Sequence, residues 1–314
     1  MRALVVGGAG QVGRRVAGRL RAAGAEVLAT YLARPPPEAE GPRAPLDKTD
    51  VEAVRALLRR FRPELVVDTG ALHNVDYCES HPEEADRVNH LGTANLARAA
   101  GENGARMIFV STDFVFDGTG RRPYPEEAEP HPQSAYAVSK LAGEAATLAA
   151  DGRNIVVRPS VVYSWTDTRR RAESSSGKGT NFGTWLVEEV RRGREVRILN
   201  DQIASPTLAD DLAEAIVALA GELPGGIYHA AGTTAVDRHA FSVRLVARLG
   251  LDPARVRPVS TAELGQKAPR PTDSSLSSER LRRMAGHRML TLPEQLDRFA
   301  RDVADDPGVD GLAR

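Results

Sequence analysis

The stretch "RALVVGGAGQVGRRVAGRL" (2–20) begins with a short apolar run, passes through three evenly spaced glycines and continues with helical spacing of apolar residues. Gly7 permits the tight turn after a strand. Gly10 removes a side chain where a pyrophosphate would approach the backbone, and Gly13 lets the helix pack closely on the strand. Free N–H groups at the start of such a helix favour phosphate. The stretch therefore predicts the dinucleotide-binding turn of an α/β fold, with a purely structural turn as the alternative.

Apolar runs and helix-like segments alternate from this turn to residue 160, with short links between them. The expected strands cover 2–7, 25–31, 64–71, 106–112 and 154–160, and the expected helices cover 11–24, 50–61, 82–104 and 132–150. The strand segments are apolar throughout, as is typical when both faces of a sheet are covered. We therefore predict a doubly wound parallel sheet of the Rossmann type with right-handed crossovers.

The alternation loosens after residue 160. A polar, Ser- and Gly-rich segment at 164–181 is expected to be a long exposed loop or lid. Helices are expected over 182–192 and 207–220, strands over 196–199 and 227–231, and a mostly helical end over 232–314. The predicted organisation is a nucleotide-binding domain formed by 1–160 plus roughly 196–231, and a smaller, mostly helical substrate-binding domain formed by 161–195 plus 232–314.

The composition of the 314 residues narrows the class of protein. A formal net charge of zero argues against a nucleic-acid binder that works through bulk positive charge. The single cysteine, Cys78, excludes an internal disulfide and fits a reducing compartment. No apolar run approaches a membrane span or a signal peptide, and the histidines show no metal-ligand spacing, so we expect a cytoplasmic protein without a metal.

A tyrosine and a lysine stand four residues apart in "QSAYAVSK" (133–140), within an expected helix. Tyr136 and Lys140 then lie on one helical face, one turn apart. The simplest interpretation is that they are two side chains of an amphipathic helix. The preceding strand, however, ends in Ser111 and Thr112, and strands of such a sheet end at the cofactor crevice. We therefore expect a hydroxyl, a phenol and an ammonium to converge beside a nicotinamide ring.

This set suits the reduction of a ketone. Hydride transfer builds negative charge on the carbonyl oxygen, which needs a proton. Tyr136 is the expected proton donor. A neighbouring ammonium, together with the positive nicotinamide when the cofactor is oxidised, is expected to lower its pKa from the ordinary value of about 10. Lys140 would also hold the ribose of the nicotinamide, and Thr112 would donate a hydrogen bond to the carbonyl oxygen.

The end of the second strand bears on the choice of cofactor. An acidic residue there would bind the ribose 2′-hydroxyl of NAD(H). The sequence has "ATYLARP" (29–35) and no carboxylate. Arg34 would meet a 2′-phosphate, so NADP(H) is favoured, with NAD(H) as the alternative. Arg34 is equally consistent with a solvated surface residue.

Segments spread over the whole chain share a family resemblance. They are "GGAGQVG" (7–13), "NVDYCES" (74–80), "VNHLGTANLARAA" (88–100), "STDFVFDG" (111–118), "YPEEAEPHPQSAYAVSKLAGE" (124–144), "DQIASPT" (201–207) and "RPTDSSL" (270–276). Together they resemble the extended short-chain dehydrogenase/reductase superfamily and, more closely, the dTDP-4-dehydrorhamnose reductase family. The resemblance implies a nucleotide-sugar substrate and a homodimer.

The resemblance also assigns residues. It makes Thr112, Tyr136 and Lys140 the catalytic trio. The implied cofactor contacts are Gly7, Gly10, Gln11, Val12, Arg34, Asp47, Ala71, His73, Asn89, Ser111, Tyr136, Lys140 and Pro159. The implied substrate contacts are Val75, Thr112, Phe114, Tyr136, Val161 and Asn181. Within the first set, Asp47 would lie near the adenine, Ala71 and His73 beside the riboses, and Asn89 near the loop that supports them.

The sequence departs from the family pattern where substrate would bind. Asp68 stands in "DTGA" (68–71), where an "NAA"-like end is usual, and His73 stands where threonine is common. Val161 occupies the place of a tryptophan that packs on the sugar, and Trp165 follows four residues later. These changes leave the redox chemistry in place and bear on the identity of the sugar.

Three functions remain open. The leading one is an NAD(P)H-dependent reductase of a 4-keto-6-deoxy sugar nucleotide. A nucleotide-sugar epimerase is the second, whereas a dehydratase is disfavoured because Phe114 replaces the glutamate of its Thr-Asp-Glu motif. The third is a non-catalytic NADP-binding protein that is similar to the regulatory subunit of methionine adenosyltransferase.

Overall fold

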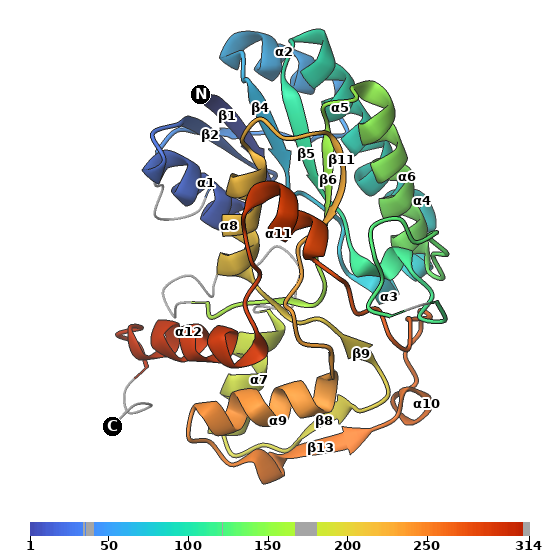
Figure 1. Ribbon diagram of the computed structural model, residues 1–314, viewed down its shortest axis with the longest axis vertical. Helices are drawn as coiled ribbons and strands as arrows, with labels where there is room; N and C mark the ends of the chain where they lie inside the picture. Colours follow the sequence, from blue (N-terminus) through green and yellow to red (C-terminus); the bar gives the residue numbers. More distant parts are fainter. Residues whose placement is uncertain (34, 36–40, 121, 167–180, 310–314) are drawn as a thin grey trace.

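The computed structural model describes residues 1–33, 35, 41–120, 122–166 and 181–309. A parallel sheet of seven strands in the order β11-β6-β5-β4-β1-β2-β3 forms one half of the molecule (Figure 1). Its strands are β1 (Arg2–Val6), β2 (Glu26–Tyr31), β3 (Arg43–Pro45), β4 (Leu65–Asp68), β5 (Arg106–Val110), β6 (Ile155–Arg158) and β11 (Gly226–His229). The predicted doubly wound parallel sheet is confirmed.

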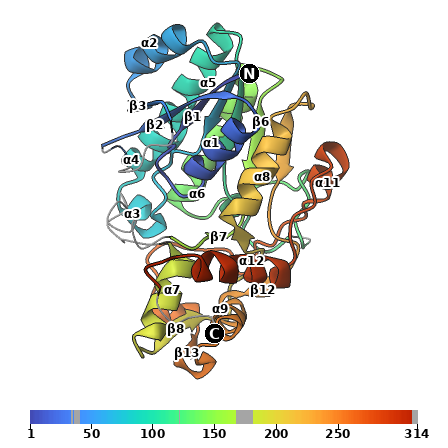
Figure 2. The same ribbon diagram turned by 90° about the vertical axis from the view of Figure 1, so that its left-hand side faces the viewer.

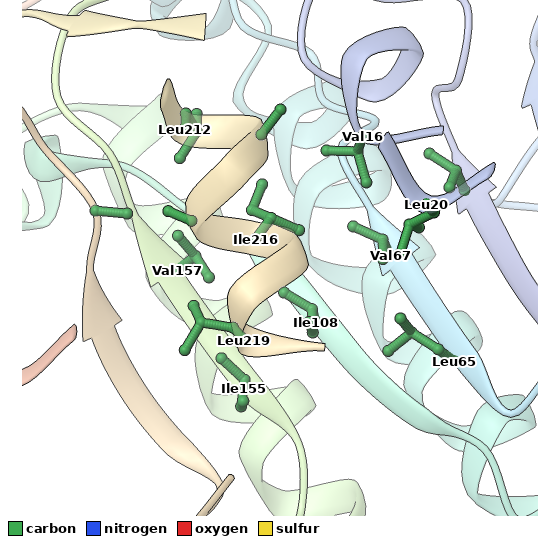
Figure 3. Packing of buried hydrophobic residues seen from close by; sticks show 14 of the residues in the cluster. Val16, Leu20, Leu65, Val67, Ile108, Ile155, Val157, Leu212, Ile216 and Leu219 are labelled. Carbon is green, nitrogen blue, oxygen red and sulfur yellow. The ribbon is translucent and has the colours of Figure 1, made fainter. Parts of the chain in front are cut away.

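Helices cover both faces of this sheet because successive strand residues point to opposite sides. Val5 and Val67 pack under one set of helices, whereas Leu4 and Val66 pack under the other. The first set is α1 (Gly13–Ala22), α8 (Ala209–Leu219) and α11 (Glu279–Ala285), and the second is α2 (Val51–Phe61), α5 (Gly92–Glu102) and α6 (Ala135–Ala150). Figure 3 shows Leu212, Ile216 and Leu219 of α8 lying over the strands.

A second core lies beyond the carboxyl edge of the sheet, in the lower part of Figure 1. It is built on α7 (Phe182–Arg191), α9 (Arg238–Arg248) and α12 (Leu292–Ala304), together with the paired strands β8 (Val196–Leu199) and β13 (Val256–Val259). Tyr163, Phe241 and Phe299 pack their rings against one another at its centre. Figure 2 shows α12 between this core and the sheet-bearing half.

The remaining elements are short. They are α3 (Val75–Ser80), α4 (Pro82–Asp86), the π-helical turn η1 (Arg87–Leu91), the 3-10 turns η2 (Asp113–Val115) and η4 (Pro253–Arg255), the strands β7 (Val162–Tyr163), β9 (Ile203–Ala204), β10 (Thr207–Leu208) and β12 (Val236–Asp237), and α10 (Thr261–Leu264). β10 pairs with β7, and β12 pairs with β9. Within the part of the chain that the structure describes, no helix is long and apolar enough to cross a membrane.

Three local expectations differ from the structure. The strand over 196–199 was expected with the nucleotide-binding half, but β8 pairs with β13, so we propose that the chain divides after β9 rather than before β8. The long helix expected over 82–104 is interrupted by η1, which buries Asn89. The end over 232–314 also contains strands, because β13 completes the two-stranded sheet with β8. Short strands of this kind depend on distant partners, so local pattern does not reveal them.

Candidate active site

The glycine loop takes the conformation that its spacing predicts. Gly7 has a φ of 74°, and a Cβ there would lie 2.9 Å from the amide nitrogen of Gly70. A Cβ on Gly13 would lie 2.6 Å from Thr69 Oγ1, so close packing of helix on strand requires glycine at this position. Among the residues that the structure describes, a Cβ on Gly10 would meet only the carbonyl oxygen of Gly7, at 3.2 Å. The protein itself therefore leaves space at Gly10 for a ligand to approach.

The start of α1 suits an anion. The helix has no side-chain cap and no acidic residue in its first turn, so its first N–H groups are not satisfied by a capping side chain. Gln11 Nε2 is buried and has no hydrogen-bond partner, which leaves a donor unsatisfied beside this turn. The loop and helix start therefore fit a dinucleotide pyrophosphate.

A buried charged cluster lies at the end of β4, the strand that pairs with β1. Lys48 Nζ donates to Asp68 Oδ2 at 2.7 Å, to the carbonyl oxygen of Gly70 at 2.6 Å and to Thr93 Oγ1 at 3.0 Å. The cluster connects the segment after β3, the end of β4 and the start of α5. Asp68 was identified from the sequence as a departure from the family pattern, but its partner Lys48 was not predicted. The signal available was the rarity of lysine in this chain.

Asn89 holds the loop that follows β4. Its side chain accepts a hydrogen bond from Leu72 N at 2.8 Å and donates to Leu72 O at 3.0 Å. It also donates to Ser139 Oγ at 3.1 Å, and Ser139 in turn donates to the carbonyl oxygen of Tyr136 at 2.8 Å. Ala71 and His73 flank Leu72, and His73 is exposed. Asn89 thus connects the expected ribose loop with the helix that carries Tyr136.

Thr112 and Tyr136 come together at the carboxyl edge of the sheet. Ser134 caps α6 by accepting from Ala137 N at 3.3 Å, which fixes the start of the helix that presents Tyr136. The Thr112 side chain acts to lower the pKa of the Tyr136 phenol, so the two side chains lie near one another. The Tyr136 ring also meets Phe114 edge to face, with centroids 6.2 Å apart. Thr112 and Tyr136 therefore border the same part of the carboxyl edge.

The pKa of Tyr136 moves opposite to the sequence expectation. Burial raises it, the Thr112 side chain acts in the other direction, and Asp113 and Cys78 raise it further. Lys140 is not among the charges that act on it. In the protein without cofactor the pKa of this phenol is therefore raised, opposite to the prediction, because loss of water around the ring dominates. Tyr136 is consequently a protonated phenol at neutral pH.

The Lys140 side chain is buried, and its ammonium lies over an aromatic ring. Its Nζ donates to the carbonyl oxygen of Val110 at 2.7 Å and stands 4.0 Å from the centroid of the Phe109 ring. Burial, followed by the charge of Lys48, lowers the pKa of Lys140 to about 7. An ammonium has three donors, and Val110 is its one acceptor among the described residues. Two donors therefore remain for ribose hydroxyls.

Asp113 and Ser111, the neighbours of Thr112 in the sequence, make further buried hydrogen bonds. Asp113 accepts from Ser160 Oγ at 2.7 Å, Ser274 Oγ at 2.5 Å and Thr112 Oγ1 at 3.1 Å, and burial raises its pKa. Ser111 Oγ donates to Glu144 at 2.5 Å, and Glu144 also pairs with Arg158. The Ser111 hydroxyl is therefore already bound within the protein.

The remaining predicted residues fall into distinct environments. Val75 and Phe114 pack with Tyr136 and the buried Cys78, near the catalytic phenol. Val161 has a φ of 40°, a strained conformation for a β-branched residue, and it directly follows Ser160. Pro159 accepts a hydrogen bond from Asp113 N at 2.9 Å. These positions surround the end of β6, where substrate was expected.

Two predicted contacts have other partners. The Asn181 carboxamide caps α7 through Gly183 N at 3.1 Å and also donates to Thr166 Oγ1 at 2.9 Å. Asp47 is exposed and binds Thr49 through N and Oγ1, both at 2.8 Å. Val12 directly precedes α1. Arg34 and positions 167–180 of the expected lid lie outside the described residues.

The parallel sheet, the glycine turn and the Tyr–Lys helix at its carboxyl edge define an extended short-chain dehydrogenase/reductase. Residues 1–304 match the family described as the RmlD substrate binding domain, and the chain belongs to this family. The resemblance stated from the motifs is confirmed.

Individual relatives span almost the whole chain. The dTDP-4-dehydrorhamnose reductase of Mycobacterium tuberculosis is 36% identical over 282 residues, which cover 88% of this chain and 85% of that protein. A crystal structure of a dTDP-4-dehydrorhamnose reductase from Clostridium acetobutylicum superposes with a TM-score of 0.84 and 28% identity, covering 97% of this chain and all 100% of that one. The enzyme of the same name from Bacillus anthracis, in complex with NADP, gives a TM-score of 0.82 and 27% identity, covering 96% and 99%.

Proposed function

We propose that the protein is an NADPH-dependent reductase that converts the C4 ketone of a 4-keto-6-deoxy sugar nucleotide to an alcohol, with Tyr136 as the proton donor. The observation that carries the proposal is the position of Tyr136 on α6, one turn before the buried Lys140, at the carboxyl edge of the sheet. The same edge carries the glycine turn and Lys140. Family membership supports the enzyme class, an NAD(P)-dependent oxidoreductase.

The residues divide the work between binding and proton transfer. Gly7, Gly10 and the start of α1, with Gln11, hold the pyrophosphate, and Lys140 holds the ribose next to the nicotinamide. Bound NADPH supplies the hydride. Tyr136 donates a hydrogen bond to the carbonyl oxygen, and Thr112 does so when its hydroxyl turns away from Asp113; both stabilise the negative charge that develops there. The Tyr136 phenol then gives its proton to that oxygen, and its burial ensures that the proton is present at neutral pH.

NADP(H) is the favoured cofactor, with NAD(H) as the alternative. The relative from Bacillus anthracis was solved with NADP, and β2 ends without a carboxylate at Thr30 or Tyr31. We propose cofactor contacts at the residues inferred from the resemblance, and substrate contacts at Val75, Phe114, Val161 and Asn181. Homodimer formation and a cytoplasmic location remain predictions.

The test is an NADPH-oxidation screen with purified protein. Keto-sugar nucleotides linked to dTDP, UDP, GDP and CDP are supplied in turn, and loss of NADPH absorbance is followed together with the sugar product. We expect stoichiometric NADPH consumption with at least one of them, and a 4-hydroxy product. Interconversion of sugars by tightly held cofactor, without net consumption, would instead indicate an epimerase. No reaction with any substrate, together with a protein partner that co-purifies, would favour a regulatory subunit.

A further inference from the structure

Arg15 lies on α1, the helix that follows the glycine turn, and its guanidinium binds three separate parts of the chain. Nε donates to Asp210 Oδ2 at 2.6 Å, Nη1 donates to the carbonyl oxygen of Gln11 at 3.0 Å, and Nη2 donates to the carbonyl oxygen of Trp165 at 3.3 Å. The Arg15 and Asp210 side chains are 10% and 16% exposed, so water and salt screen their ion pair little. One side chain thus joins the glycine turn to α8 and to the segment after β7.

The bond to Gln11 acts on a peptide unit at the start of α1. The carbonyl of Gln11 and the N–H of Val12 belong to one planar, trans peptide, so they point in opposite directions. The Val12 N–H donates to no acceptor among the described residues, as is usual for the N–H groups that precede the first turn of a helix. A bond that fixes the carbonyl therefore also fixes the direction of this free donor. A cation bound to the carbonyl oxygen polarises the peptide as well and makes its N–H a stronger donor.

The other two partners of Arg15 are themselves held in place. Asp210 lies in the first turn of α8, which packs against α1 on the same face of the sheet. Trp165 is buried, its Nε1 donates to Asp306 Oδ2 at 2.9 Å, and its ring meets Phe299 of α12 edge to face with centroids 6.0 Å apart. Because both anchors are packed in this way, the guanidinium has little freedom to move away from the glycine turn.

Arg19, one turn further along α1, has a different set of partners. Its Nη2 donates to Asp210 Oδ1 at 3.1 Å and to Glu214 Oε1 at 2.9 Å, both on α8. Within the described part of the chain, the glycine turn is not among its partners. Arg19 thus joins the same two helices through the same carboxylate, but only Arg15 of the two also holds the turn.

We propose that Arg15 is a positioning residue for the cofactor: it holds the Gln11–Val12 peptide so that the Val12 N–H is aimed at the pyrophosphate. This inference rests on the proposed function for the placing of the pyrophosphate at the glycine turn. Pyrophosphate oxygens are strong acceptors, and a donor that is already aligned binds them without first being ordered. Arg15 acts through the peptide, since Nε, Nη1 and Nη2 are each bound within the protein. The buried Gln11 Nε2, which has no partner, offers a second donor on the same residue.

The test measures NADPH affinity, stability in urea and the Val12 amide. Arg15→Met is expected to weaken NADPH binding by about 3–10-fold in a fluorescence titration, the range of one net hydrogen bond. In protein labelled with ¹⁵N-valine, the Val12 amide resonance of the cofactor-free variant should move, because the carbonyl bonded to that nitrogen has lost a charged donor. Arg15→Lys keeps a cation beside Asp210 but not the planar fork, so it should retain the stability and still bind NADPH more weakly than the unaltered protein.

Arg19→Met is the matched control, since it removes an arginine from the same helix and from the same Asp210. It should lower stability in urea, bind NADPH as the unaltered protein does and leave the Val12 resonance in place. Unchanged NADPH affinity in both Arg15 variants, or a Val12 resonance that Arg15→Met does not move, would overturn the proposal. Equal losses of NADPH affinity in Arg15→Met and Arg19→Met would also overturn it, because both arginines would then act only through the stability of the fold.

The outcome is separable from that of the proposed reaction, because NADPH binding is measured without a sugar substrate. NADPH binding that depends on Arg15, in a protein that reduces no keto-sugar nucleotide, would retain the positioning role and remove the reductase. Reduction in which Arg15→Met leaves the KM for NADPH unchanged would retain the reductase and remove the positioning role. An unaltered protein that binds neither NADPH nor NADH would reject both.

Discussion

The ammonium of Lys48 and the carboxylate of Asp68 form a buried ion pair, with 2.7 Å between Nζ and Oδ2. The two residues are 20 positions apart, and the pair joins the segment after β3 to the end of β4. Thr93 contributes a hydroxyl to both members, at 3.0 Å from Lys48 Nζ and 3.1 Å from Asp68 Oδ2. The pair therefore fixes two segments that border the expected cofactor crevice.

Lys48→Met should destabilise the protein by about 3–5 kcal/mol, because it leaves the Asp68 carboxylate buried without its cation. Urea unfolding measures the change. The double variant Lys48→Met/Asp68→Leu should recover most of the lost stability, since no charge then remains buried. A single variant as stable as the unaltered protein would contradict a structural role for the pair.

Tyr136→Phe should lower kcat by about 100-fold or more, the usual contribution of a general acid, while NADPH affinity stays unchanged. Steady-state kinetics and a fluorescence titration of NADPH measure the two quantities. Tyr77 provides the control, because its hydroxyl binds Glu84 at the surface, at 2.8 Å, away from Thr112. Tyr77→Phe should retain kcat. Equal turnover of the two variants would remove Tyr136 from the mechanism.

The lowered pKa of Lys140 predicts a pH dependence of stability. Its pKa is about 7 in the folded protein against 10.5 for the free side chain, so the unfolded chain binds more protons between these values. Stability therefore rises with pH through this window. Without cofactor, the free energy of unfolding should rise relative to Lys140→Met by on the order of 3–5 kcal/mol from about pH 6 to 10.5. Parallel pH curves for the two proteins would show that this ammonium is not desolvated.

Asn89→Ala should raise the KM for NADPH and lower kcat, because the side chain joins the Leu72 loop to the Tyr136 helix. It should also cost about 1–3 kcal/mol of stability, since backbone groups of Leu72 lose their partners. Asn103→Ala is the control, as Asn103 donates only to Ala99 O one turn earlier on α5, at 2.7 Å. Similar kinetics in both variants would argue against this connection.

Cys78 should not react with iodoacetamide in the folded protein at neutral pH. The side chain is buried, and burial raises the pKa of its thiol to about 11, so little thiolate is present. Mass spectrometry checks this, with the urea-unfolded protein as the reactive control. Rapid labelling of the native protein would show that the cluster of Cys78, Val75 and Phe114 opens readily.

Features that depend on residues close together in the sequence were predicted well. The glycine turn and the single helical face of Tyr136 and Lys140 depend on residues within one turn of one another. The alternation of apolar and helical segments in the first half was also sufficient for the sheet. The apolar strand segments also indicated that helices cover both faces of the sheet.

Features that depend on distant residues were not predicted. The Lys48–Asp68 pair and the pairing of β8 with β13 each join segments separated in sequence. The pKa of Tyr136 was given the wrong direction because desolvation depends on everything that surrounds the ring, including Phe114. The spacing of residues in the sequence predicts which side chains lie near one another, but not how far burial removes water from them.

The hydrogen bond from Ser274 to Asp113 spans 161 positions of the chain. During synthesis the sheet strands through β6 emerge from the ribosome well before Ser274 does. Domains generally fold as they emerge, so the amino-terminal sheet can form while Asp113 still lacks this donor. Completion of the surroundings of Thr112 is therefore a late event in translation, and a truncated chain that ends before Ser274 would retain a Rossmann sheet but leave its reactive edge unfinished.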